Sequence, residues 1–171
     1  MSEEHVSRVT AREDPIATGR LGKTVSGIAY LRAMQAGELP AAPIMGLVGM
    51  RIAEIGEGRV VFAGEPAENQ YNPMGTVHGG ILALLLDSAM GSSVQSMLPP
   101  GTSYTTLELK VNYLRPVISQ TGTLYGEGKL IHLGNRTATA EGRLTDEAGK
   151  LYAHGTTTCL IFRPSSVSPT K

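Results

Sequence analysis

The spacing of apolar residues changes along this chain, and each spacing predicts one type of secondary structure. Near the start, Ile28, Leu31 and Met34 recur at the three- to four-residue interval of a helix. Thr24 or Ser26 can cap this helix, and a glycine followed by a proline can end it. A short amphipathic helix is therefore expected as the first element.

A β-hairpin is predicted after this helix. Residues 43–46 are expected to be a connector, and strands are expected over residues 47–55 and 59–64, on either side of the turn at 56–58. Residues 65–77 then form a long loop that holds two prolines and a glycine. A loop of this length in a compact domain is often functional.

The most apolar segment begins at Gly79 and extends to about Met97. Its first half is apolar on all sides, with an unbroken run from Ile81 to Leu86. The segment is far longer than a usual strand, so its length favours a helix, and a helix that is apolar all round belongs in a protein core. The apolar run itself is too short to cross a bilayer, so no membrane association is expected.

Four strands are expected after the central helix, over residues 106–113, 122–133, 136–145 and 151–162. Short turns rich in glycine, asparagine and aspartate separate the last three, and such turns join antiparallel neighbours. The predicted fold class is therefore α+β, an antiparallel sheet with the long helix packed on one face. In the first of these strands, apolar and polar residues alternate strictly: Leu107, Leu109, Val111 and Tyr113 against Thr106, Glu108, Lys110 and Asn112.

Composition narrows the class of protein further. The 171 residues suit a single domain, expected over residues 23–163, with a flexible arm over 1–22 and a flexible tail over 164–171. Lys and Arg number 15, as do Asp and Glu, and this zero net charge argues against nucleic-acid binding. The start lacks a signal-peptide pattern, so a cytoplasmic location is expected. The single cysteine, Cys159, excludes an internal disulfide and is expected to be a buried, inert thiol.

Candidate chemistry concentrates where the central helix begins. Gly79 and Gly80 let a ligand approach the first backbone N–H groups of the helix, which have no partner inside it. Such N–H groups can polarise a carbonyl and stabilise the oxyanion that forms when the carbonyl is attacked. Alternatively, the two glycines serve only close packing between the helix and the sheet.

Asp87 is the second candidate, because it closes the apolar run on a helix expected to lie in the core. A buried carboxylate is costly, which favours a role as an acid, base or nucleophile. The alternative is a carboxylate satisfied by donors such as Ser88 or Thr106. Gly79 and Asp87 are eight residues apart, ~12 Å along one helix, so a site that uses both must be shared by two antiparallel helices from two subunits.

His78 precedes the glycine pair and is a candidate base or metal ligand. The other three histidines show no ligand spacing with it, so no metal is expected. At a helix start, a histidine that orients the loop by hydrogen bonding is a stronger expectation than one that acts directly in catalysis.

One set of spaced residues surrounds the helix start: Asn72, Gly75, His78, Gly79, Gly80 and Asp87. This set resembles the motif of the PaaI-like branch of the hotdog-fold thioesterases, the relatives of phenylacetic acid degradation proteins. The resemblance extends from about residue 26 to residue 162. It implies a hotdog fold, in which a six-stranded antiparallel sheet wraps around the long helix, with a short N-terminal helix. It also implies homodimers that pair into homotetramers, and acyl-CoA thioester hydrolysis without a cofactor.

The resemblance further implies a role for each residue of the site. Asp87 is the general base or nucleophile, the Gly79 N–H polarises the thioester carbonyl, and Asn72 helps to hold the attacking water or the carbonyl. Thr106 hydrogen-bonds near the attacking water, and His78 supports the loop.

The expected substrate is a small-to-medium acyl-CoA with an aromatic or short acyl group. Gly80, Arg115, Asn135 and Arg136 are expected to bind it, although each of the last three also fits a solvated surface position. Three other functions stay open: an acyl-CoA-binding protein without turnover, a hotdog hydratase or dehydratase, and a structural domain. The carboxylate disfavours the first, the spacing of the histidine and the aspartate disfavours the second, and the third leaves the motif unexplained.

Overall fold

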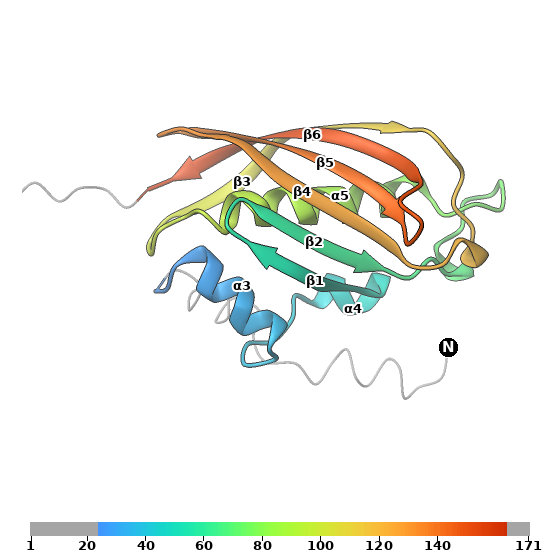
Figure 1. The fold of residues 1–171 in the computed structure, drawn as a ribbon, viewed down its shortest axis with the longest axis horizontal. Coiled ribbons are helices and arrows are strands. Elements are labelled where there is room, and N and C mark those ends of the chain that lie inside the picture. Colours follow the sequence, from blue (N-terminus) through green and yellow to red (C-terminus); the bar gives the residue numbers. More distant parts are fainter. Residues whose placement is uncertain (1–23, 164–171) are drawn as a thin grey trace, which may run out of the picture.

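The computed structural model describes residues 24–163, so the arm expected over residues 1–22 and the tail expected over 164–171 lie outside the described residues. A six-stranded antiparallel sheet curves around one long helix (Figure 1). The helices are α3 (Gly27–Gln35), α4 (Pro43–Val48) and α5 (Gly79–Gln95), with single 3₁₀ turns at Glu68–Gln70 and Ser119–Thr121. The strands are β1 (Met50–Gly56), β2 (Arg59–Gly64), β3 (Ser103–Tyr113), β4 (Leu124–Leu133), β5 (Thr137–Asp146) and β6 (Leu151–Phe162).

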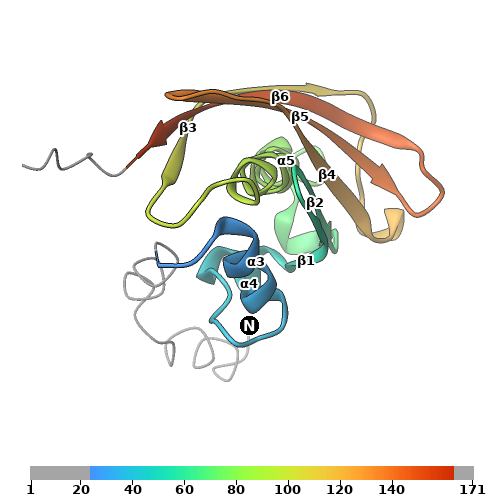
Figure 2. The same ribbon diagram turned by 60° about the vertical axis from the view of Figure 1, so that its left-hand side comes forward.

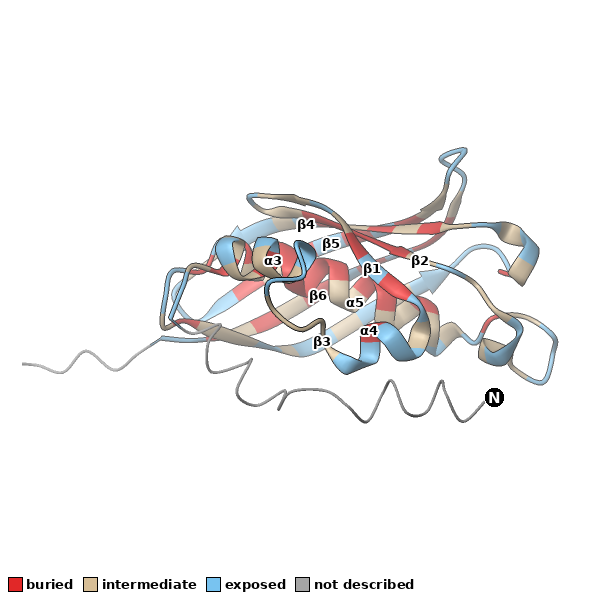
Figure 3. Cartoon of the chain, turned by 90° about the horizontal axis from the view of Figure 1, so that it is seen from below, coloured by how far each residue is buried: buried red, intermediate tan, exposed pale blue. Residues whose placement is uncertain are grey.

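The sheet has the strand order β1-β2-β4-β5-β6-β3. Its concave face packs on α5, while α3 and α4 lie on the open side of that helix (Figure 2). Leu86, Met90 and Val94 of α5 are fully buried and belong to one core cluster with buried residues of the strands. Figure 3 shows buried positions along α5 and along the strands around it. The predicted α+β class, the six-stranded antiparallel sheet, the central helix and the short N-terminal helix are confirmed.

Glycines let the sheet approach α5 more closely than any side chain would allow. A Cβ added at Gly128 of β4 would lie 2.2 Å from the carbonyl oxygen of Ala89. A Cβ at Gly142 of β5 would lie 2.9 Å from Cγ of Met90. The close contact holds α5 firmly against the strands, which positions the residues that α5 carries.

The structure corrects the expected boundary between connector and strand before the hairpin. Residues 43–48 form a helix, α4, rather than a connector followed by the start of a strand. Proline suits a first helical position, where Pro43 lies, and Gly49 ends the helix in a left-handed conformation with φ 66°. The strand β1 therefore begins at Met50.

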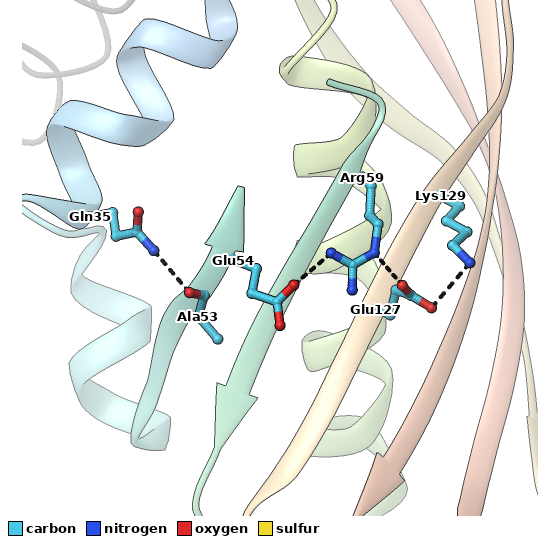
Figure 4. A network of polar contacts seen from close by, with 6 residues as sticks. All are labelled: Gln35, Ala53, Glu54, Arg59, Glu127 and Lys129. Carbon is cyan, nitrogen blue, oxygen red and sulfur yellow. Dashed lines mark hydrogen bonds and ion pairs between the residues drawn. The ribbon is translucent and has the colours of Figure 1, made fainter. Parts of the chain in front are cut away.

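The helix α3 is attached to the rest of the domain at both ends. At its start, the Gly27 N–H donates to the Leu98 carbonyl at 2.9 Å, and a Cβ on Gly27 would overlap the Gln95 carbonyl. At its end, Gln35 Nε2 donates to the Ala53 carbonyl of β1 at 3.0 Å (Figure 4). Side chains of β1, β2 and β4 form an ion-pair network beside it: Glu54, Arg59, Glu127 and Lys129 (Figure 4).

Within residues 24–163, no helix combines the length and the apolar character needed to cross a membrane.

Candidate active site

The start of α5 leaves one backbone donor free. His78 is the N-cap, and its Nδ1 accepts a hydrogen bond from the Gly80 N–H at 2.9 Å. The N–H of Gly79 has no acceptor among residues 24–163. The hydrogen bond between His78 and Gly80 thus closes the first turn of the helix. The Gly79 N–H, at the positive end of the helix dipole, is available to a ligand.

Tyr113 holds this helix start from the neighbouring strand. Its hydroxyl donates to the Gly79 carbonyl at 2.9 Å, and a Cβ on Gly79 would lie only 3.2 Å from its Cζ. Sequence reasoning assigned Tyr113 to a strand and missed this contact. The alternation of β3 was the available signal, because it places Tyr113 on the same face as Leu109 and Val111.

Asn72 organises the loop that leads into α5. Its Oδ1 accepts from the N–H groups of Met74 at 2.9 Å and Thr76 at 3.3 Å, and its Nδ2 donates to Thr76 Oγ1 at 3.0 Å. The loop is further joined to the body of the domain by the Val77 N–H, which donates to the Val117 carbonyl at 2.8 Å. Asn72 and Gly79 line one cavity of about 420 Å³.

Asp87 lies in the middle of α5, eight residues beyond Gly79, and its carboxylate has a single side-chain hydrogen-bond partner. Thr106 Oγ1 donates to Asp87 Oδ1 at 3.0 Å, whereas Ser88 makes no hydrogen bond with it within the described chain. The carboxylate is half-buried in the isolated chain. The two interpretations of Asp87 therefore coexist: Thr106 satisfies one oxygen, and the rest of the carboxylate remains open to a reactant.

A β-bulge turns Thr106 toward Asp87 and corrects the predicted strict alternation. The pairing of β3 with β6 shifts between Thr106 and Glu108, so Thr106 faces α5 and Leu107 is 59% exposed. Buried Thr157 of β6 donates to the Glu108 carbonyl at 2.8 Å and thereby holds the bulge. Bulges beside functional sites commonly redirect one side chain in this way.

Asp87 and Gly79 open into different cavities of the chain. Asp87 lines a cavity of about 440 Å³ between α3, α5 and β3. Gly79 and Asn72 do not line this cavity. The structure therefore does not bring the predicted catalytic residues together within one subunit. It groups Asn72, His78 and Gly79 at one end of α5, and Asp87 with Thr106 in the middle of the helix.

The structure does not bring the predicted substrate-binding residues together. Arg115 lines the cavity of Gly79, and its guanidinium donates to the Leu151 carbonyl. Asn135 and Arg136 lie in the β4–β5 turn and line neither the cavity of Gly79 nor that of Asp87. The strand β6 lies between β5, which follows this turn, and Thr106 of β3.

Two further expectations concern cysteine and metal chemistry. Cys159 is fully buried, as predicted, and burial raises the pKa of its thiol. The described residues contain no group of three or more His, Cys, Asp or Glu side chains that could hold a metal ion.

Comparison with known proteins assigns the family. The model of the thioesterase superfamily matches residues 74–153, which include the helix start, Asp87 and Thr106. The 1,4-dihydroxy-2-naphthoyl-CoA hydrolase of Listeria monocytogenes serotype 1/2a (strain 10403S) is 30% identical over 104 residues, covering 61% of this chain and 83% of the relative. The chain belongs to the thioesterase superfamily.

Solved structures agree with this membership. A phenylacetic acid degradation-related protein of Ralstonia eutropha JMP134 is 32% identical with a TM-score of 0.70, covering 77% of this chain and 98% of the other. A mutant of the phenylacetic acid degradation protein PaaI of Thermus thermophilus is 30% identical with a TM-score of 0.63, covering 72% of this chain and 100% of the other. This thioesterase therefore has the hotdog fold and the PaaI-like resemblance that its motif predicts.

Proposed function

We propose that this protein hydrolyses acyl-CoA thioesters at a site shared by two subunits, with Asp87 from one subunit and the Gly79 N–H from the other. One observation carries the proposal: α5 presents an unpaired N–H donor at its start and an Asp87 carboxylate held by Thr106, in two separate cavities. Each cavity alone holds half of what thioester hydrolysis needs.

Hydrolysis divides between these groups in a defined way. The thioester carbonyl oxygen accepts from the Gly79 N–H, which stabilises the negative charge that develops on it. Asp87 removes a proton from water as the water oxygen attacks the carbonyl carbon, or attacks that carbon itself. The carbon–sulfur bond then breaks and the coenzyme A thiolate takes a proton. On the second route this leaves a mixed anhydride on Asp87, which water hydrolyses to the free acid and the Asp87 carboxylate. Oxygen from labelled water enters Asp87 only on the second route, when water attacks the Asp87 carbon of the anhydride, so labelled Asp87 after a single turnover would establish that route.

Supporting roles follow from the contacts of the remaining residues. Thr106 orients the Asp87 carboxylate, and His78 fixes the first turn of α5 by binding the Gly80 N–H. Asn72 orders the loop beside Gly79 and has a second N–H that is available to water or the carbonyl.

The edge of the sheet offers a way to build the shared site. The strand β3 is 11 residues long and pairs on one side only within the described sheet. Pairing of two β3 edges about a two-fold axis sets two α5 helices antiparallel, which brings each Gly79 toward Asp87 of the partner subunit. The apolar or aromatic side chains on and just after β3 are 49–59% exposed, which suits a covered interface: Leu107, Tyr113 and Leu114. Pairing of such dimers into a homotetramer, and a cytoplasmic location, stay predictions.

The proposed substrates are acyl-CoAs with small-to-medium acyl groups, aromatic or short-chain. The cavity beside Asp87 has the size of a small-molecule site. One relative is named a hydrolase of an aromatic acyl-CoA, which supports this class. Arg115, Asn135 and Arg136 are the proposed contacts of the coenzyme A nucleotide, since their side chains can donate hydrogen bonds to phosphate. Acyl-CoA binding without turnover is the alternative, and it gives no reason for the Thr106–Asp87 contact.

Two experiments test the proposal. A panel of acyl-CoAs assayed by free-thiol release should show turnover that Asp87→Asn lowers by about 10²–10⁴-fold. Near wild-type turnover in that variant would contradict the catalytic role.

The second experiment tests whether two subunits share the active site. Equal amounts of Asp87→Asn and Gly79→Pro chains, unfolded and refolded together, should recover about a quarter of wild-type activity, because half of the dimers are hybrids with one intact site. Hybrids that form but stay inactive would contradict the shared site.

A further inference from the structure

The first turn of α5 contains a chain of hydrogen bonds that passes through one peptide group. The Tyr113 hydroxyl donates to the Gly79 carbonyl at 2.9 Å. The N–H at the other end of the same peptide group, that of Gly80, donates to His78 Nδ1 at 2.9 Å. The carbonyl and the N–H of a trans peptide point in opposite directions, so the plane of this group is held at both ends. The Tyr113 hydroxyl is thereby linked to the His78 ring through the backbone.

The two successive glycines make this support important. Glycine has no Cβ, so the peptide group between Gly79 and Gly80 can rotate more freely than one between residues with side chains. The Gly79 N–H, the proposed oxyanion donor, lies between the His78 cap and this peptide group. Anchoring both of its neighbours therefore fixes the direction in which the donor points.

The sheet provides a rigid base for Tyr113. Its backbone is paired with Ala153 of β6 at the last register position of β3. Directly after it, the Leu114 N–H donates to the Tyr152 carbonyl at 2.8 Å. The Tyr113 ring lies over Gly79, where an added Cβ would be 3.2 Å from Cζ and 3.5 Å from Cε1. Within the described chain, Tyr113 is the one strand residue whose side chain hydrogen-bonds to the first turn of α5.

The exposure of Tyr113 argues against a role in stability alone. The residue is 52% exposed, so water can replace both partners of its hydrogen bond to Gly79. A bond of this kind adds little to the free energy of unfolding, because folding only exchanges it for bonds to water. Its effect is to restrict which way the peptide group faces.

We infer that Tyr113 is a positioning residue for hydrolysis, whose hydroxyl acts through the peptide group of Gly79 and Gly80 to order the His78 ring and to fix the direction of the Gly79 N–H. The inference rests on the proposed function for the reaction that this order serves. His78 Nδ1 accepts a hydrogen bond and carries no proton, so the neutral ring has its proton on Nε2. A hydrogen bond to a carbonyl polarises the N–H of the same peptide and strengthens the bond that this N–H donates. Loss of the Tyr113 hydroxyl therefore weakens the hold on Nδ1 and lets the ring exchange between tautomers.

Nitrogen-15 NMR of the histidine rings tests the chain without turnover. A ring nitrogen that carries a proton and one that does not differ widely in chemical shift, so the spectrum reports the tautomer directly. At a pH where His78 is neutral, the wild-type protein should show one tautomer, with the proton on Nε2. Tyr113→Phe should move both ring shifts toward the average of the two tautomers. Because the chain has four histidines, His78→Asn assigns the signals by their loss.

Kinetics test the consequence for the reaction. Tyr113→Phe keeps the ring over Gly79 and removes the hydroxyl, so kcat should fall by about 3- to 10-fold with little change in KM. Tyr71→Phe is the matched control, because the Tyr71 hydroxyl makes two hydrogen bonds, both to Ser119 and neither to α5. It should lower the Tm at least as much as Tyr113→Phe does, while the His78 tautomer and kcat stay close to those of the wild-type protein.

The outcomes separate this inference from the proposed function. A folded Tyr113→Phe variant with an unchanged His78 spectrum, or with an unchanged kcat, would overturn the inference and leave the hydrolase standing. Equal losses of kcat in Tyr113→Phe and Tyr71→Phe would overturn it as well. If the wild-type protein hydrolyses no acyl-CoA of the panel, the proposed function fails and the spectra decide the inference: a shift confined to Tyr113→Phe supports the ordering of His78, and its absence overturns it.

Discussion

The N–H of Gly79 can be removed without breaking a hydrogen bond within the described chain, which allows a direct test of the oxyanion role. Gly79 is the first residue of α5, a position where proline is common. His78 has φ −59° and ψ 133°, the extended conformation that a residue before proline prefers. Gly79→Pro should therefore keep the helix start while it removes the donor.

The expected loss of kcat depends on the role of the Gly79 N–H and on the contacts of the atoms that each substitution adds. Loss of one oxyanion donor lowers kcat by about 10²–10³-fold. Gly79→Ala is the matched control, because it keeps the N–H and adds a Cβ that would lie 3.2 Å from Tyr113 Cζ. Tyr113 is 52% exposed, so its ring can move by the few tenths of an ångström required. The alanine variant should lose less than about tenfold in kcat.

Both variants are compared by kcat and KM on the best thioester of the panel, with thermal unfolding to show that each is folded. The proline variant should lose kcat with little change in KM, because the donor acts on charge that develops in the transition state. A folded proline variant with the same kcat as the alanine variant would refute the assignment of the Gly79 N–H.

Three further predictions follow from the contacts of α5. Thr106→Val removes the donor to Asp87 but keeps a β-branched strand residue, so kcat should fall by about 10- to 100-fold, whereas Thr106→Ser should retain most of the wild-type kcat. Equal kcat values for the two variants would show that Asp87 needs no donor. Gly128→Ala should destabilise the fold by about 1–3 kcal/mol or more, because the added Cβ meets a backbone carbonyl. Gly142→Ala should destabilise the fold less, because its Cβ meets the flexible Met90 side chain, and equal denaturation midpoints would contradict this difference. Incubation with a chelator should leave kcat unchanged, and a loss restored by one added metal would contradict the expected metal-free mechanism.

The sequence by itself determined the elements whose signals are local. The apolar run after the glycine pair identified α5 to within two residues of its end, and glycine- and asparagine-rich turns identified the β4–β5 and β5–β6 hairpins. The motif around Gly79 and Asp87 identified the family. These signals depend on propensity, spacing and turn chemistry. Residues close together in the sequence determine all three, so the rest of the fold is not needed to recognise them.

Tertiary contacts decided the features that depend on residues far apart in the chain. The inward turn of Thr106 needs a bulge that Thr157 holds from another strand, so alternation within β3 could not reveal it. The same applies to Tyr113 over Gly79. Local spacing specifies which elements form, whereas their packing specifies which polar atoms are left to act on a substrate.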